Sequence, residues 1–118
     1  METYTAHDLQ EALPPIASLI SKSEKAQRKL TPGTWQHTML RNNLRVLHCA
    51  FALITENGND TDLTQEDRRE ALLALSSMID KTEKAQEKFS SGSSQYTLLQ
   101  NRLKALCIAE TLIKNEAK

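Results

Sequence analysis

Residues 5–54 of this 118-residue chain recur without a gap at residues 64–113, at a constant offset of 59 positions. In that register 23 of the 50 aligned pairs are identical, and both copies hold a glycine at the same point, Gly33 and Gly92. Self-similarity at a fixed period is typical of one supersecondary unit written twice. A 59-residue unit alone would bury a small share of its surface, so we expect the two copies to fold together as a single domain over residues 1–118.

Each copy divides at a short break, Thr-Pro-Gly at residues 31–33 and Ser-Ser-Gly at residues 90–92. Glycine suits the left-handed position that closes a helix, and proline cannot continue the helical hydrogen bonds. On both sides of each break, apolar residues recur at helical spacing over broad stripes. The pattern predicts an all-α fold, a four-helix antiparallel bundle built from two tandem helical hairpins. An exposed loop at residues 55–63 would join the hairpins.

The first helical stretch is interrupted by Pro14 and Pro15, where the second copy has leucine and alanine. A proline inside a helix removes a hydrogen bond and clashes one turn back, at a cost of about 3 kcal/mol. We therefore expect residues 5–13 to form a separate turn or kinked segment, with the main helix beginning at the prolines. The third helix has a clear start at Thr64, whose hydroxyl suits a capping position before several carboxylates.

Four glutamines shared by the two copies fall in the middle of the apolar stripes: Gln27, Gln36, Gln86 and Gln95. A buried amide without partners costs about 1–3 kcal/mol, so these side chains must bond to each other, to helix ends or to water. The structural interpretation is that they cap the turns and fix the hairpin register. The functional alternative is that they line a polar pocket at one end of the bundle.

Three further residues are candidates for an interface or a pocket. Asn43 and its counterpart Arg102 project into the apolar arc, where an arginine needs a carboxylate, a carbonyl or an escape to solvent. They either lie at the periphery or mark a polar interface with a second subunit or a ligand. Trp35 belongs to the first copy alone and follows the break, where an exposed indole would anchor a partner. Alternatively, it covers the end of the core.

Lysines repeat on the opposite side of the first and third helices, and both copies hold the same three: Lys22, Lys25 and Lys29, then Lys81, Lys84 and Lys88. Solvated lysines need no explanation, but two equivalent cationic stripes could also bind an acidic partner. Lys plus Arg equals Asp plus Glu, at 15 each. This balance argues against a dedicated nucleic-acid binder, whose affinity depends on excess positive charge.

Several classes of chemistry have no recognisable motif here. There is no glycine-rich phosphate loop, no histidine paired with carboxylates or thiols at metal-ligand spacing, and no Glu-x-x-His pair of the di-iron bundles. We expect no catalytic residues, no metal and no cofactor. Cys49 and Cys107 lie in apolar stretches, which predicts buried thiols rather than a disulfide.

No segment has the features of a membrane anchor or a secretory signal. The uncharged run at residues 46–55 is too short to span a bilayer, and the amino terminus lacks a basic region followed by an apolar core. A soluble cytoplasmic protein is the expectation. Its expected role is a non-enzymatic protein-interaction or scaffold module that binds another protein or a second copy of itself. The alternative is a small-ligand sensor with a polar pocket near the hairpin turns.

Overall fold

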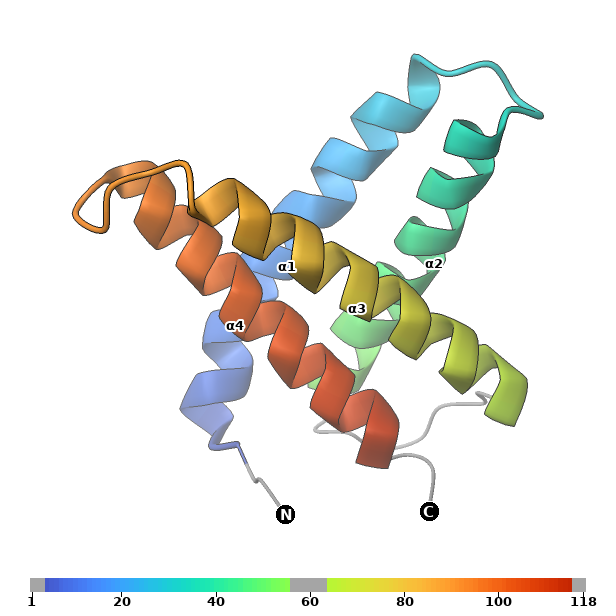
Figure 1. Cartoon of the computed structure of the whole chain (residues 1–118). Coiled ribbons are helices and arrows are strands. Elements are labelled where there is room, and N and C mark those ends of the chain that lie inside the picture. Colours follow the sequence, from blue (N-terminus) through green and yellow to red (C-terminus); the bar gives the residue numbers. More distant parts are fainter. Residues whose placement is uncertain (1–3, 56–63, 116–118) are drawn as a thin grey trace.

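The computed structural model describes residues 4–55 and 64–115, and within these ranges the chain is all-helical. Its four helices are α1 (Ala6–Arg28), α2 (Trp35–Thr55), α3 (Gln65–Gln86) and α4 (Ser94–Asn115). Figure 1 shows α1 beside α2 and α3 beside α4, each pair joined by one short segment. The prediction of four helices and no strands is confirmed for the described residues. Beyond Thr55, which ends α2, the expected loop at 55–63 lies outside those residues.

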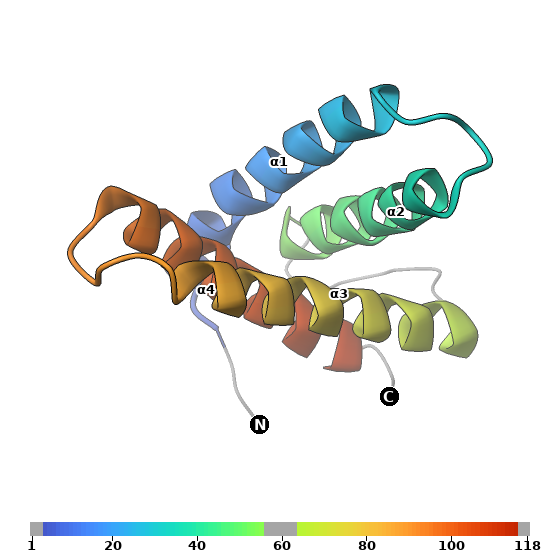
Figure 2. The same cartoon turned by 45° about the horizontal axis from the view of Figure 1, so that its top comes forward.

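The two helix pairs form two layers that cross each other. In Figure 1, α3 and α4 pass in front of α1 and α2, and Figure 2 shows the same two layers from another side. Helix α4 packs against all three other helices, whereas α1 and α3 do not touch within the described part of the chain. The molecule is correspondingly flat, with principal extents of 40 × 36 × 19 Å. Its radius of gyration is 14.4 Å, against about 13.5 Å for a compact domain of this length.

The hydrophobic core lies at the crossing. The largest fully buried side chains are Ile16, Leu47, Leu53, Leu75, Leu106, Ile108 and Ile113. Full burial of such a side chain stabilises the fold by about 1.5–3 kcal/mol. Towards the two connecting segments the stripes lose their cover. Ala26 is exposed, Leu30 is half-buried, and Phe89 is 40% exposed, because these residues extend beyond the crossing.

Helices α1 and α3 begin in the same way. Thr5 Oγ1 accepts the backbone N–H of Asp8 at 3.0 Å, and the Asp8 carboxylate accepts the N–H of Thr5 at 3.1 Å. Thr64 and Asp67 make the same two bonds at 3.0 and 3.4 Å. Each capping box satisfies two backbone donors that a helix start leaves unpaired. The cap predicted at Thr64 is confirmed, and the equivalent cap at Thr5 was not foreseen.

Helix α1 runs through Pro14 and Pro15 without ending, so the prediction that its main part begins at the prolines is wrong. The capping box at Thr5 stabilises the first turn, and Leu9 and Ala12 are buried in the core ahead of the prolines. Together these contributions offset the hydrogen bonds that the two prolines remove. The ribbon of α1 changes direction along its length in Figure 1, as proline-containing helices commonly do.

The two connecting segments end in equivalent hydroxyl caps at Thr34 and Ser93. Each hydroxyl donates to the carbonyl three residues before it, at 2.8 Å in both cases. Each also accepts the backbone N–H three residues after it, at 3.3 Å for Thr34 and 3.1 Å for Ser93. The same bonds thus fix the start of α2 and the start of α4.

The glycines of these segments do not close helices as the sequence predicted. The C-cap residues of α1 and α3 are Lys29 and Glu87, both in right-handed conformation. Gly33 adopts φ +95°, but it precedes the cap of α2, and Gly92 stays outside the left-handed region. The hydroxyl caps order the second segment without a left-handed residue. Gly33 alone of this pair therefore depends on glycine's conformational freedom.

The expectation of buried thiols is wrong for Cys107, which is exposed, while Cys49 is half-buried. Cys107 lies on the side of α4 that carries exposed Lys104, away from the buried stripe of Leu106 and Ala109. Apolar neighbours along the sequence misled the prediction because a helix sends adjacent residues to different faces. Neither cysteine is in a disulfide.

The different backbone conformations of Gly33 and Gly92 predict different effects of alanine substitution on stability. We expect Gly33→Ala to lower the free energy of unfolding by roughly 1–2 kcal/mol, because alanine is strained at φ +95°. Gly92→Ala should be neutral or stabilising by up to about 1 kcal/mol, since it restricts only the unfolded chain. A methyl group at either position would meet no atom within 4 Å, so strain is the sole difference. Urea denaturation of both variants checks this, and equal losses would contradict it.

Candidate functional site

The glutamines predicted at mid-stripe bond within their own helix pairs. Gln27 Nε2 donates to the carbonyl of His37 at 3.5 Å, and Gln86 Nε2 donates to the carbonyl of Tyr96 at 3.4 Å. These two bonds occupy equivalent positions in the two copies. Gln86, which is 9% exposed, also donates to Gln100 Oε1 at 2.7 Å. Both amides thereby link the end of one helix to the start of the next.

The other two glutamines differ from each other: Gln36 is half-buried and Gln95 is exposed. The segment joining α1 to α2 and the segment joining α3 to α4 lie at separate ends of the molecule (Figure 1). The structure therefore brings Gln27 towards α2 and Gln86 towards α4. It does not gather the four glutamines and Arg102 around one pocket.

Arg102 is half-buried on the stripe of α4 that also carries the fully buried Leu106 and Ala109. Its Nη2 atom is buried and has no hydrogen-bond partner among the described residues. Burial lowers the pKa of the Arg102 guanidinium, because the charged form loses hydration. The carboxylate or carbonyl partner that the sequence required for this side chain is not present in the described part of the fold. Its counterpart Asn43 is also half-buried.

A groove of about 640 Å³ runs between the start of α2 and the middle of α3. We call it the α2/α3 groove, and it is lined by Gly33, Trp35, Thr38, Met39, Asn42, Asn43, Leu73, Ala74 and Ser77. Trp35 is 70% exposed and Leu73 is 67% exposed, the highest values among the large hydrophobic side chains described. The sequence singled out Trp35 and Asn43 but missed Leu73. A helical pattern cannot reveal that this part of α3 lacks a covering neighbour.

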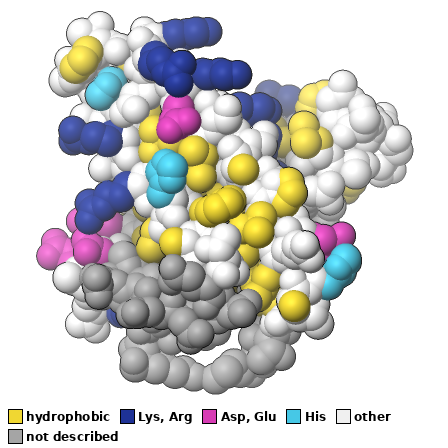
Figure 3. Space-filling view, turned by 180° about the vertical axis from the view of Figure 1, so that it is seen from behind, with side chains coloured by type: hydrophobic (Ala, Val, Ile, Leu, Met, Phe, Trp, Pro, Cys, Tyr) yellow, Lys and Arg dark blue, Asp and Glu magenta, His cyan; other side chains and the backbone are white. Residues whose placement is uncertain are grey.

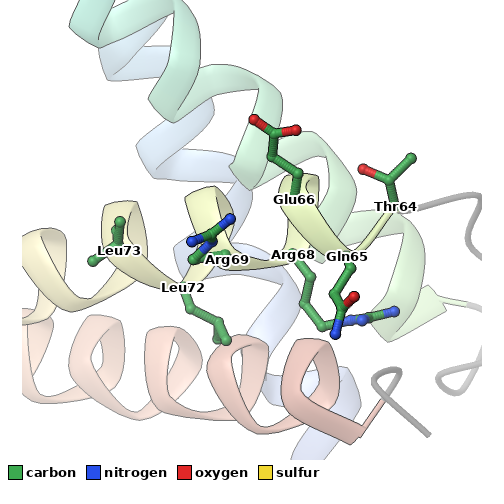
Figure 4. Close-up of a pocket in the computed structure, with 7 residues that line it drawn as sticks. All are labelled: Thr64, Gln65, Glu66, Arg68, Arg69, Leu72 and Leu73. Carbon is green, nitrogen blue, oxygen red and sulfur yellow. The ribbon is translucent and has the colours of Figure 1, made fainter.

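The apolar surface continues along α3 from this groove towards the start of that helix. A second hollow is lined by Thr64, Gln65, Glu66, Arg68, Arg69, Leu72 and Leu73, so Leu73 belongs to both. In Figure 4, Leu72 points towards α4, while Leu73 and Arg69 lie on the other side of α3. An apolar side chain and a cation thus stand together on the uncovered face of this helix.

Two smaller polar pockets occupy equivalent places between the layers. One, between α2 and α3, is lined by Asn42, Arg45, Val46, Cys49, Asp67, Glu70 and Ala71. The other, between α1 and α4, is lined by Asp8, Glu11, Ala12, Pro15, Asn101, Lys104, Ala105 and Ile108. Every residue of the first pocket has its counterpart in the second at the 59-residue offset. The equivalence of the two pockets can be seen in the sequence, because Asn, Asp and Glu are identical at three of the polar positions and the fourth pairs Arg45 with Lys104.

Each polar pocket contains one ion pair that joins the two layers. Arg45 Nη2 lies 3.3 Å from Asp67 Oδ1, and Lys104 Nζ lies 3.8 Å from Asp8 Oδ1. The backbone N–H of Thr5 lowers the pKa of Asp8 most, followed by the Thr5 hydroxyl and the charge of Lys104. Both pairs are exposed to solvent, and each connects a side chain of one layer to a side chain of the other.

All six repeated lysines are exposed: Lys22, Lys25, Lys29, Lys81, Lys84 and Lys88. Lys84 pairs with Asp80 at 3.1 Å along α3. Lys81 reaches across to α2, where its Nζ lies 4.0 Å from Met39 Sδ. One cation of the second stripe therefore stands at the edge of the α2/α3 groove.

Comparisons with protein-family models, with curated proteins and with solved structures found no match to this chain. Within residues 4–55 and 64–115, no group of three or more His, Cys, Asp or Glu side chains could hold a metal ion. None of the described helices is both long and apolar enough to cross a membrane. The function must accordingly be argued from the grooves, the charges and the differences between the two copies.

The bonds of Gln86 predict a cost for its removal. We expect Gln86→Ala to lower the free energy of unfolding by about 1–3 kcal/mol, because the carbonyl of Tyr96 and the amide of Gln100 lose a buried donor. Gln95→Ala, at an exposed site, should change it by less than about 0.5 kcal/mol. Thermal and urea denaturation measure both variants, and equal effects would refute the assignment of Gln86 to the turn.

The buried Nη2 atom of Arg102, which has no hydrogen-bond partner among the described residues, predicts that removing this side chain stabilises the fold. We expect Arg102→Met to raise the free energy of unfolding by about 1–3 kcal/mol, because methionine fills a similar space without a buried unpaired donor. Arg41→Met, at an exposed site on α2, serves as the control and should have little effect. Urea denaturation decides the matter, and a loss of stability in Arg102→Met would show that this arginine is needed by the fold.

Proposed function

We propose that this chain is a non-enzymatic protein-interaction module whose binding surface is the α2/α3 groove. The observation that carries the proposal is the exposure of Trp35 and Leu73, at 70% and 67%, in one groove with Met39 and Ala74. Burying a large apolar side chain contributes about 1.5–3 kcal/mol, and tryptophan is enriched among the residues that dominate binding energies. Two such side chains in one hollow favour a partner that covers them.

Comparison of the two copies supports a binding role over a folding role for these residues. At the 59-residue offset, Ser94 takes the place of Trp35 and Pro14 takes the place of Leu73. Most of the largest fully buried side chains and all of the helix caps are, by contrast, similar in both copies, as with Ile16 and Leu75 or Leu47 and Leu106. Exposed apolar side chains that one copy has and the other lacks are not requirements of the shared scaffold.

The occupant that fits best is an amphipathic helix of another protein. A groove between two helices accepts the apolar face of a third, which is a recurring mode of peptide recognition. Lys81 stands at the groove edge, and Arg69 lies beside Leu73 in the adjoining hollow. In a symmetric homodimer the same patch meets itself, so these cations would face their own copies. A partner with acidic flanks avoids that repulsion.

The proposal extends to the origin of the scaffold. We infer that an ancestral helical hairpin was duplicated, giving two antiparallel hairpins related by a pseudo-twofold axis. The support lies in bonds that recur at the 59-residue offset: the capping boxes, the hydroxyl caps, the glutamine amides and the ion pairs between layers. Duplication would leave one copy at liberty to acquire a binding groove.

The test is affinity capture from native cells with matched full-length baits. The groove variant carries Trp35→Ala and Leu73→Asp, and the control carries Leu98→Asp, at a 50% exposed apolar residue of α4. We expect a partner retained by wild type and control but weakened at least tenfold by the groove variant, about 1.4 kcal/mol. The contact should map to an amphipathic helix of that partner.

Sedimentation of the same proteins over a dilution series tests the other occupant. A dimer that the groove variant abolishes and the control keeps would assign the groove to a second copy and refute the partner helix. Equal capture by all three baits would refute the groove as the binding surface. Circular dichroism confirms that the variants remain folded, since all three substitutions are at exposed positions.

A further inference from the structure

Most of the first helix pair carries an excess of positive charge. Beyond Asp8 and Glu11 at the start of α1, residues 14–55 hold six Lys and Arg side chains and a single carboxylate, Glu24, a formal excess of five. The equivalent residues 73–114 hold six Lys and Arg against four carboxylates, an excess of two. The whole chain is neutral, so the first helix pair is one pole of a polarised molecule.

Most of these cations have no carboxylate partner within residues 4–55 and 64–115. Arg45 pairs with Asp67, but no carboxylate of the described residues lies within 4.0 Å of the cationic groups of Lys22, Lys25, Arg28, Lys29 or Arg41. All five are exposed. We call these five residues the basic tip. Among residues 73–114, three of the six cations are paired, Lys84 with Asp80, Lys104 with Asp8 and Lys114 with Glu110.

The basic tip occupies the end of the α1/α2 pair. Figure 3 shows Lys and Arg side chains gathered at that end, away from the carboxylates near the starts of α1 and α3. Trp35, which opens α2 directly after the connecting segment, is 70% exposed at the same end. The α2/α3 groove therefore begins beside the basic tip, because Trp35 and Gly33 line the groove.

At equivalent positions, the first copy carries more positive charge than the second. Arg28 corresponds to Glu87, Arg41 to Gln100, and unpaired Lys25 to Lys84, which has its own aspartate. The α3/α4 end thus has the same backbone and retains lysines but is not a strong cationic surface. A like-charged cluster without internal compensation destabilises a free protein slightly and is relieved by an anionic partner.

We propose that the basic tip binds an acidic segment of a partner protein. This inference rests on the proposed function and names the partner's chemistry: carboxylates lie against the tip while an adjoining apolar stretch enters the groove past Trp35. Electrostatic attraction of this kind mainly speeds association and aligns the partner. Lys81, at the edge of the groove beside Met39, would attract further carboxylates of the same partner.

A protein segment fits these observations better than the other anionic partners. Single-stranded nucleic acid is bound through rows of stacking aromatics, and in the described residues Trp35 is the one aromatic side chain that is exposed beside the tip. A membrane surface is bound by helices that are apolar along a whole face, whereas α1 turns its apolar stripe into the core. One tryptophan among arginines is typical of a protein interface.

The experiment uses the full chain and its single tryptophan as a fluorescent reporter at the tip. Two probes are titrated at low salt: poly-L-glutamate, and a peptide with glutamates on one helical face and leucines on the other. The tip variant is Lys25→Gln with Lys29→Gln. Its matched control is Lys84→Gln with Lys88→Gln, the same two positions in the second copy.

We expect both probes to shift the Trp35 emission, with affinity falling as salt is raised. The tip variant should weaken binding of both probes at least tenfold, and the control less than twofold. Equal weakening by the two variants, or no binding to wild type at low salt, would overturn the proposal. Preference for an oligothymidine or for phosphatidylserine vesicles over the acidic peptides would overturn it as well.

A third variant keeps this inference distinct from the proposed function. Leu73→Asp removes the apolar contact of the groove but leaves the basic tip unchanged. This variant should weaken binding of the amphipathic peptide and leave binding of poly-L-glutamate unchanged. If Leu73→Asp weakens binding of the amphipathic peptide while the tip variant does not, the groove is supported as a binding surface and the inference about the basic tip is wrong. The reverse result would retain the tip and refute the groove.

Discussion

The packing of α2 and α4, each of which contacts all three other helices, is the constraint on which the rest of the structure depends. The buried stripe of α4, with Leu106 and Ala109 at full burial, joins the two layers at their crossing. Because helices of about 22 residues are roughly 33 Å long, a crossing covers only part of each one. The groove lies beside the crossing, between the start of α2 and the middle of α3, and the basic tip lies beyond the crossing on the α1/α2 pair. The surfaces that stay exposed are thus a geometric consequence of how the core is formed.

The helices themselves could be read from the sequence, since apolar spacing on either side of each break identifies which residues face inward. The crossing of the two layers could not be predicted from the sequence, because an apolar stripe shows which face of a helix is buried but not the angle at which a neighbouring helix covers it. The continuity of α1 was missed for a different reason. The capping box of Thr5 and Asp8, which matches that of Thr64 and Asp67, stabilises the first turn of α1 ahead of Pro14 and Pro15, and the sequence prediction did not include it.

The candidate site was predicted in part. The glutamines stood out because they break the apolar pattern, and the structure gives Gln27 and Gln86 bonds across their turns. Trp35 stood out because the second copy lacks it. The sequence also predicted a cationic surface that includes Lys22, Lys25 and Lys29, but it did not single out Leu73, Arg28 or Arg41, because a single leucine or arginine looks ordinary in a sequence. Differences between the copies mark them better than identities do. Identical positions at the 59-residue offset include the capping boxes and the turn glutamines, whereas Trp35, Leu73, Arg28 and Arg41 are all positions at which the two copies differ.

The paired polar pockets have one more consequence. Both are built from the same four polar positions, which lie 59 residues apart in the sequence. A substitution at one pocket therefore has a matched counterpart at the other within the same chain, and the fold carries its own internal reference for what a polar contact between the layers contributes.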